Sequence, residues 1–192
     1  MSSIGLGNRS GIDARSLGTR RLLSGALVAL GAARAVDDLE VAAIVARAGI
    51  ARSTFYAHFA GKDDFLVRSF VNMLAAAETA ARAKYPERDD LLPSQALFRH
   101  VYDAGDFARR MADADIFPTQ MAAGELKLRE IVEANLERLK PDWPRQRRHE
   151  TAVYVAGGFI GLMRWWIQGG LKQTPERMQQ AFERLSRTAL DG

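Results

Sequence analysis

Apolar residues recur at intervals of three and four along most of this 192-residue chain. That spacing places them on one face of a helix, whereas a half-buried strand alternates apolar and polar residues, a pattern that no segment shows convincingly. In residues 17–35, for example, Leu23, Leu27 and Leu30 fall on one stripe. The sequence therefore predicts an all-α protein whose amphipathic helices bury their apolar faces against one another.

The composition removes several classes of protein. There is no cysteine, which excludes disulfides, thiolate metal sites and cysteine nucleophiles, and which suits a reducing, cytoplasmic setting. The longest apolar run, residues 153–163, has 11 residues, while a membrane-spanning helix needs roughly 20. Residues 1–16 contain no apolar block, so we expect neither a signal peptide nor a membrane anchor there, but a flexible arm.

A short helix followed by a sharp turn is predicted after the first helix. Residues 41–48 carry the apolar spacing of a helix, and Asp37 and Asp38 are candidate capping residues in front of it. Gly49 follows, and glycine tolerates the positive φ of a tight turn. A second short helix begins directly afterwards, so the local order is helix, sharp turn, helix.

This next helix, residues 52–59, has two aromatic residues one turn apart, Phe55 and Phe59, as its inward anchors. Its other faces carry hydrogen-bond donors and no acidic residue. The whole formal charge of +4 also lies in residues 1–62, because the remainder of the chain is balanced. Such an excess indicates either a polyanionic partner for the first third of the chain or an ordinary solvated surface.

Longer helices are predicted in the remainder of the chain, separated by polar or proline-containing segments. One begins at Lys62 and fades near Pro86, and shorter ones begin near Ser94 and Asp106. The chain is interrupted around Phe117 and Pro118 before further helices over about 125–139, 146–168 and 174–190.

One segment of this pattern resembles a known family. Residues 48–66, with the sequence AGIARSTFYAHFAGKDDFL, are similar to the turn, recognition helix and following helix start of TetR-family transcriptional regulators. The likeness extends over Arg20 to Leu66, and the two helices from Tyr154 to Leu190 resemble the family's dimerisation helices more loosely. It implies a three-helix DNA-binding domain over 17–62, a connecting helix over 63–84, and an effector-binding and dimerisation domain over 63–192.

The resemblance also implies roles for individual residues. Thr54, Tyr56, His58 and Lys62 would bind backbone phosphates, and Arg52, Ser53 and Ala57 would face base edges in the major groove. Their chemistry agrees, because hydroxyl and ammonium groups hold phosphates, whereas arginine can make a bidentate pair with guanine. Two departures are Ala51, where the family usually has a serine cap, and Val45, which replaces a smaller alanine.

The body of such a regulator is expected to hold a small hydrophobic effector. Large apolar side chains suited to a cavity wall occur between residues 98 and 166, with His100 and Asp103 as possible polar anchors. The predicted lining consists of Phe98, Tyr102, Phe107, Met111, Met121, Phe159, Met163 and Trp166. The same residues could equally form plain core.

A homodimer interface is predicted on the last two helices. Gly157 and Gly161 lie four residues apart and allow another backbone to approach closely, with Trp165 four residues further on. The matching stripe on the last helix contains Met178, Phe182 and Leu185. An ordinary helix crossing within one chain would use the same spacing.

No catalytic, cofactor or metal site is predicted. His58, His100 and His149 lack ligand spacing, and the sequence has neither a nucleophile elbow nor the context of a phosphate-binding loop. These absences disfavour an enzyme, and the resemblance implies a repressor: a homodimer that binds a pseudo-palindromic operator and is released by its effector. The alternatives are a DNA-binding dimer whose body binds a protein partner or no ligand and, more remotely, a small helical enzyme.

Overall fold

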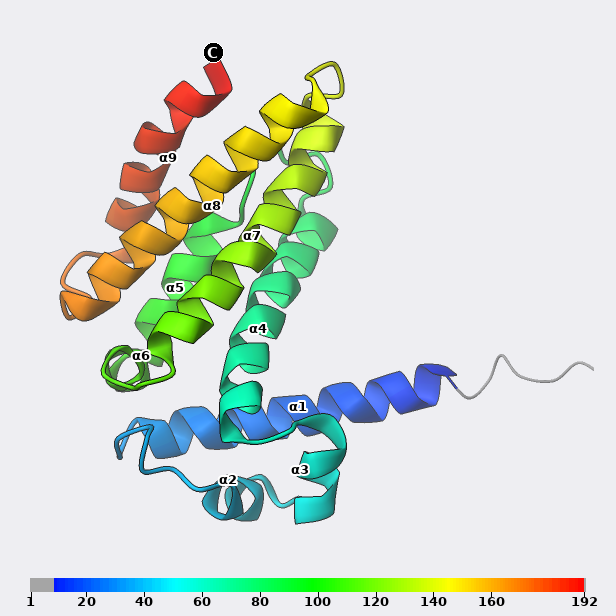
Figure 1. Cartoon of the computed structure of the whole chain (residues 1–192), viewed down its shortest axis with the longest axis vertical. Coiled ribbons are helices and arrows are strands. Elements are labelled where there is room, and N and C mark those ends of the chain that lie inside the picture. The colour runs from blue at the N-terminus through cyan, green and yellow to red at the C-terminus, as the bar shows by residue number, and fades with distance from the viewer. Residues whose placement is uncertain (1–8, 192) are drawn as a thin grey trace, which may run out of the picture.

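The computed structural model describes the backbone of residues 9–191 and the side chains of residues 17–187 (Figure 1). The described residues form nine helices and no strand, so the predicted all-α class is confirmed. The helices are α1 (Arg9–Gly31), α2 (Val41–Ala48), α3 (Arg52–His58), α4 (Lys62–Lys84), α5 (Ser94–Ala104), α6 (Asp106–Ala112), α7 (Phe117–Leu139), α8 (Arg145–Gln168) and α9 (Pro175–Asp191). None of these described helices is long and apolar enough to cross a membrane.

Two helices begin earlier than the sequence predicts. α1 starts at Arg9, so residues 9–16 of the predicted flexible arm are helical, and residues 1–8 lie outside the described part of the chain. Extending an existing helix adds one hydrogen bond for each residue fixed, and no proline interrupts this stretch. α7 starts at Phe117, where the sequence predicts an interruption. Pro118 lies in its first turn, where the missing N–H costs nothing.

The sharp turn between α2 and α3 is confirmed. Gly49 has φ 67° and ψ 31°, the left-handed conformation, and its N–H binds Ala46 O at 3.2 Å. The predicted capping role of Asp37 and Asp38 is wrong, because Glu40 is the N-cap residue of α2 and no side chain caps the helix. The loop between α1 and α2 is instead held by hydrogen bonds from the start of α4 and from the segment after α6.

Buried apolar residues form two clusters. The first, here called the head cluster, joins α1, α2, α3 and the start of α4, and at its centre the Phe59 and Phe65 rings lie 4.9 Å apart. The second fills the body formed by α5 to α9 and the remainder of α4, with the Phe98 and Phe159 rings 4.8 Å apart. α4 therefore begins in one cluster and ends in the other.

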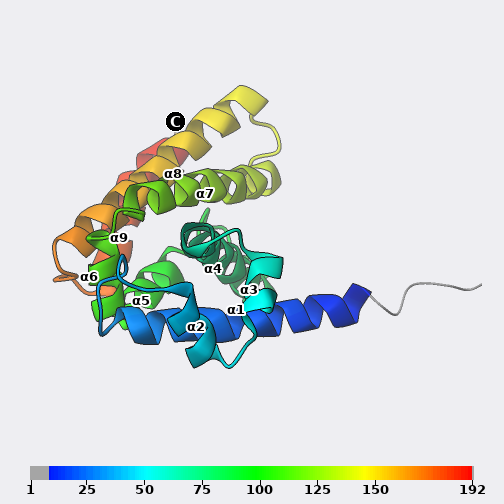
Figure 2. The ribbon, with the colours of Figure 1, turned by 60° about the horizontal axis from the view of Figure 1, so that its bottom comes forward.

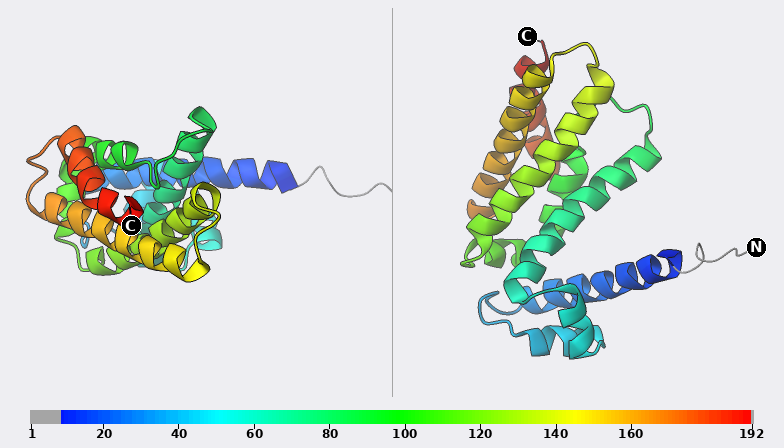
Figure 3. Two further views of the ribbon diagram at one scale, coloured as in Figure 1. Left: turned by 90° about the horizontal axis from the view of Figure 1, so that it is seen from above. Right: turned by 45° about the vertical axis from the view of Figure 1, so that its right-hand side comes forward.

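α1 lies across one end of the body, with its N-terminal part extending beyond it (Figures 1 and 3). α6 lies beside its C-terminal half (Figure 2). Met111 of α6 and Ala114, which follows this helix, complete the head cluster, where both are buried. Arg110 Nε also donates to Ala32 O at 3.2 Å, and the Asp115 N–H donates to Asp37 Oδ2 at 3.3 Å. The joint between head and body is thus both apolar and hydrogen-bonded.

Candidate nucleic-acid interface and ligand cavity

The orientation of α3 follows from its two inward phenylalanines. Phe55 and Phe59 are buried, and both rings pack against Phe65 of α4. Because α3 is fixed on this side, its remaining side chains face outward. Arg52, Ser53, Tyr56 and Ala57 are exposed, and Thr54, His58 and Lys62 are half-buried. The seven residues predicted to contact DNA therefore all retain solvent access on one short segment.

No side chain caps α3, in agreement with the alanine at position 51. Ala51 is extended, with φ −70° and ψ 144°, and its carbonyl accepts the N–H of Thr54 at 3.0 Å. A missing cap costs a helix about 1 kcal/mol. α3 is therefore stabilised mainly by the packing of Phe55 and Phe59 rather than by its own N-terminus.

Arg52 and Tyr56 lie one turn apart and contact each other. Arg52 Nη2 donates to Tyr56 Oη at 3.5 Å, and the guanidinium carbon lies 5.6 Å from the centre of the tyrosine ring. This hydrogen bond raises the pKa of Arg52, so the guanidinium remains charged. The contact aligns the one arginine of α3 with an exposed hydroxyl, both directed away from the head cluster.

Lys62 differs from the other predicted phosphate ligands, because its side chain donates to backbone carbonyls far away in the sequence. Lys62 Nζ donates to Asp37 O at 2.6 Å and to Val36 O at 3.3 Å. Two of its three N–H donors therefore connect the start of α4 to the loop between α1 and α2. The sequence did not indicate this link, because the partners are carbonyl oxygens 25 and 26 residues away.

A cavity of about 510 Å³ lies at the joint between head and body. Its walls come from α1, α4, α5, α6 and α7, together with Ile167 of α8. Of the eight residues predicted to line a cavity, Phe107, Met111 and Met121 do so. The sequence does not predict the walls supplied by α1 and α4, because the resemblance places those helices in the head and in a connector.

The other predicted lining residues lie elsewhere. Phe98, Phe159, Met163 and Trp166 are fully buried in the body, where they fill the space between α5, α8 and α9. Tyr102 is exposed and stacks on Trp166, with ring centres 6.1 Å apart. The four buried residues Phe98, Phe159, Met163 and Trp166 therefore belong to the packed core, which was the alternative to a cavity wall.

The cavity wall is largely apolar and carries no Asp, Glu, Lys or Arg. Its polar side chains are Ser24, Ser69, His100 and Gln120. Desolvation lowers the pKa of His100, and the nearby Asp103 carboxylate opposes this only in part. The imidazole is consequently uncharged at neutral pH.

The predicted dimer residues divide into two groups. Met178 and Phe182 are buried within the chain, where Phe182 packs on Phe159 with ring centres 5.1 Å apart. A Cβ atom at Gly157 would lie 3.8 Å from Glu125 Oε1 of α7, so this glycine faces its own chain. Trp165 and Leu185 are 57% and 50% exposed.

The exposed face of α8 forms a stripe of four residues, Tyr154, Gly158, Gly161 and Trp165. A Cβ atom at Gly158 or Gly161 would meet nothing within 4 Å, and Tyr154 is 59% exposed. Gly158 and Tyr154 were not in the predicted set, although Gly158 lies three residues before Gly161 and four after Tyr154, spacings that also place residues on one face of a helix. We call these four residues the α8 stripe.

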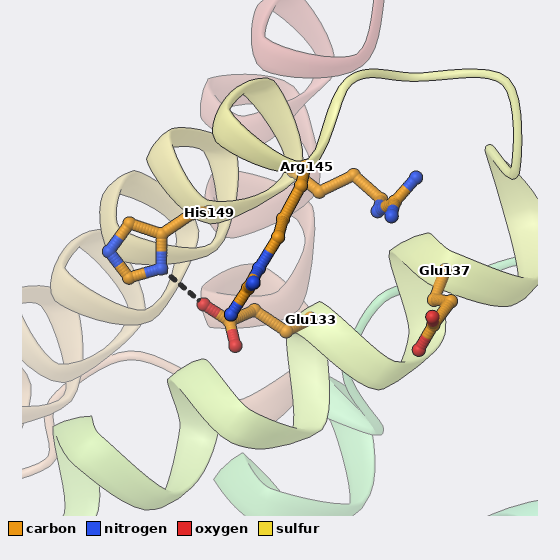
Figure 4. Close-up of a pocket in the computed structure, with 5 residues that line it drawn as sticks. Glu133, Glu137, Arg145 and His149 are labelled. Carbon is orange, nitrogen blue, oxygen red and sulfur yellow. Dashed lines mark hydrogen bonds and ion pairs between the residues drawn. The ribbon is translucent and has the colours of Figure 1, made fainter.

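At the opposite end of α8, charged residues surround a hollow of about 450 Å³ (Figure 4). His149 Nδ1 pairs with Glu133 Oε1, and Glu137 and Arg145 lie beside them. Arg148 Nη1 donates to Trp143 O at 2.5 Å, which fixes the loop between α7 and α8. Both signs of charge are present, and among the described residues no group of His, Asp and Glu is suited to hold a metal ion.

Comparison with known proteins gives two family matches. The profile described as "Bacterial regulatory proteins, tetR family" matches residues 23–68, which contain the whole segment from α2 to the start of α4. The profile described as "Transcriptional regulator C-terminal region" matches residues 94–188, from α5 into α9. The curated proteins contain no match to the chain.

Solved structures share the fold at low sequence identity. The dihydroxyacetone kinase operon activator DhaS has a TM-score of 0.66 at 17% identity, covering 88% of this chain and 94% of its own. A TetR-family regulator from Syntrophomonas wolfei has a TM-score of 0.64 at 14% identity, covering 91% and 95%. A TetR transcriptional regulator from Rhodococcus sp. RHA1 has a TM-score of 0.64 at 14% identity, and the match covers 92% of this chain and 97% of that one. The two profiles, which together match residues 23–68 and 94–188, show that the chain belongs to the TetR family of transcriptional regulators.

Proposed function

We propose that this regulator is a homodimer that represses transcription by occupying a pseudo-palindromic operator in the cytoplasm, and that a small molecule releases it. The observation that carries the proposal is the outer face of α3, where Arg52 and Tyr56 stand exposed on a helix anchored by buried phenylalanines. A recognition helix needs this combination, since it must be rigidly held and still present donors to a groove.

On DNA, Thr54, Tyr56 and His58 would contact phosphates and fix the register of α3. Arg52, together with Ser53 and Ala57, would face the base edges. The guanidinium is the group best suited to read sequence, because a bidentate pair with guanine contributes about 1–3 kcal/mol of discrimination. Lys62 would have one N–H left for a phosphate, so we assign it mainly to the head's internal structure.

A second copy of the chain would pack on the α8 stripe, together with Leu185 of α9. The support is the pairing of two exposed aromatic rings with two glycines that leave open space beside the helix. Two-fold symmetry would place the two α3 helices at half-sites about 34 Å apart, or a multiple of that distance.

Release by a small molecule rests on the cavity at the joint, whose walls include both head and body helices. A molecule that binds one arrangement of the joint more tightly would change operator affinity by 5- to 150-fold for a coupling of about 1–3 kcal/mol. DhaS is named as an operon activator, and a reporter gene placed behind the operator distinguishes activation from the repression that we expect here.

The proposal is tested by selecting binding sites from random duplex DNA with the purified full chain. We expect an enriched inverted repeat, bound by two chains. Arg52→Ala should weaken binding to that repeat, whereas Lys172→Ala removes an exposed charge from the loop after α8 and should leave it unchanged. Enrichment of no sequence, or equal losses for the two variants, would contradict the proposed role of α3.

A further inference from the structure

The cavity at the joint begins at the surface of α1 itself. Ser24, Gly25 and Val28 of α1 form part of its wall. A Cβ atom built at Gly25 would meet no other atom within 4 Å, so the absence of a side chain there leaves space. A molecule in this cavity would therefore touch a helix of the DNA-binding head directly, rather than only the helices of the body.

The opposite walls favour apolar groups of irregular shape. Phe70 and Met73 of α4 lie on one side, and Phe107 and Met111 of α6 on another. Methionine side chains are unbranched and polarisable, and they adapt to the outline of a ligand. The volume of about 510 Å³ falls within the range of roughly 300–1,000 Å³ that small-molecule sites occupy.

The charge of the wall limits the ligand further. No Asp, Glu, Lys or Arg lines the cavity, so an ion entering it would lose its hydration without gaining a counter-ion. Ser69, His100 and Gln120 supply polar atoms, and Gln120 already uses Nε2 to donate to Leu66 O at 3.1 Å. Asp103 is the charged group beside His100, and the imidazole itself is neutral.

We propose that the joint cavity binds an uncharged, mainly apolar small molecule with one hydrogen-bonding group, and that α1 is one of the surfaces against which it packs. The regulatory meaning of this site rests on the proposed function, but the binding itself needs no DNA. The bound ligand would therefore contact α1 and α4 at the same time, and both helices contribute residues to the head cluster.

The test uses two fluorescent probes that differ by one charge: the neutral N-phenylnaphthylamine and its sulfonated analogue anilinonaphthalene sulfonate. Titrated into the full chain, the neutral probe should saturate at one site per chain and bind about tenfold or more tightly than the sulfonate. Gly25→Leu fills the cavity from α1 and should weaken the neutral probe about tenfold or more. Gly18→Leu is the matched control, because Gly18 lies two turns earlier on α1, is exposed with open space around it, and does not line the cavity.

Val28→Phe narrows the same wall from an exposed position and should reproduce the loss if Gly25→Leu fails to fold. Equal affinity of the two probes for the wild-type chain overturns the proposed ligand class. Unchanged binding of the neutral probe by the folded α1 variants overturns the proposed site. Operator binding is measured separately without probe, so a failure of the DNA-binding proposal leaves this result interpretable.

Discussion

The ring of Phe107 in α6 lies directly against Gly31, the last residue of α1. A Cβ atom at residue 31 would stand 2.6 Å from Phe107 Cδ2 and 2.8 Å from Cε2, closer than real contacts allow. Phe107 also lines the joint cavity. The head and the body therefore meet at a point where one added methyl group must displace a cavity wall.

Gly31→Ala should lower the free energy of unfolding by about 1–3 kcal/mol, the usual cost of overpacking, because an aromatic ring has few ways to move aside. Urea unfolding at one fixed protein concentration measures the change. Gly18→Ala is the control and should be neutral or slightly stabilising, since its Cβ meets open space. Identical midpoints for the two variants would contradict the tight contact.

Lys62→Met should destabilise the head by about 1–3 kcal/mol even without DNA, because hydrogen bonds from a charged donor to two loop carbonyls are lost. Lys172→Met removes an exposed lysine elsewhere and should change little. The comparison is made by thermal unfolding. If Lys62→Met unfolds like the wild type yet binds DNA poorly, the ammonium acts on phosphate rather than on the loop.

Arg52→Ala should weaken binding to the matched operator by about 1–3 kcal/mol and relax the preference at one base pair. Tyr56→Phe should weaken binding to every sequence alike, because it removes a hydroxyl assigned to phosphate. Competition assays on matched and singly mismatched duplexes separate the two effects. The base-reading role of Arg52 fails if its substitution costs the same on both duplexes.

Trp165→Arg should raise the dimer dissociation constant about tenfold or more, because it places a charge in the centre of the interface proposed on the α8 stripe. Tyr85→Arg is the matched control, because the rings of Trp165 and Tyr85 are exposed to nearly the same degree, 57% and 58%. Sedimentation velocity over a range of concentrations reports the association. An unchanged dimer in the tryptophan variant would move the interface away from the α8 stripe.

Glu78 connects the end of α4 to the rest of the body. Desolvation raises its pKa, but hydrogen bonds from Arg82 and Asn135 and the charge of Arg88 outweigh this, so the net pKa is lowered. A lowered folded pKa gives stability that is present above the unfolded value near 4.5 and is lost as the pH falls through the folded value. Glu78→Gln should thus destabilise the chain at pH 7 and flatten its acid unfolding curve below pH 5. If the stability of Glu78→Gln falls with pH in parallel with that of the wild type, the Glu78 carboxylate does not contribute to acid unfolding.

The sequence by itself determined the helical class of the fold and the inward side of α3. The spacing of Phe55 and Phe59, and the glycine at position 49, act within one or two turns, so the local order of residues is sufficient to predict them. The same reasoning assigned Phe98 and Trp166 to a cavity wall, because a buried apolar face looks alike whether it meets a ligand or another helix.

Only the tertiary structure decided what each buried face meets. Lys62 finds its carbonyl partners 25 and 26 residues away, and Arg110 binds Ala32 across 78 residues. The Arg110 contact joins α6 to the residue that follows α1, and the cavity lies at this joint, with α1 as a wall. Helical periodicity fixes which side of a helix is apolar, but the choice of partner depends on the summed packing of residues distant in sequence, which no local pattern encodes.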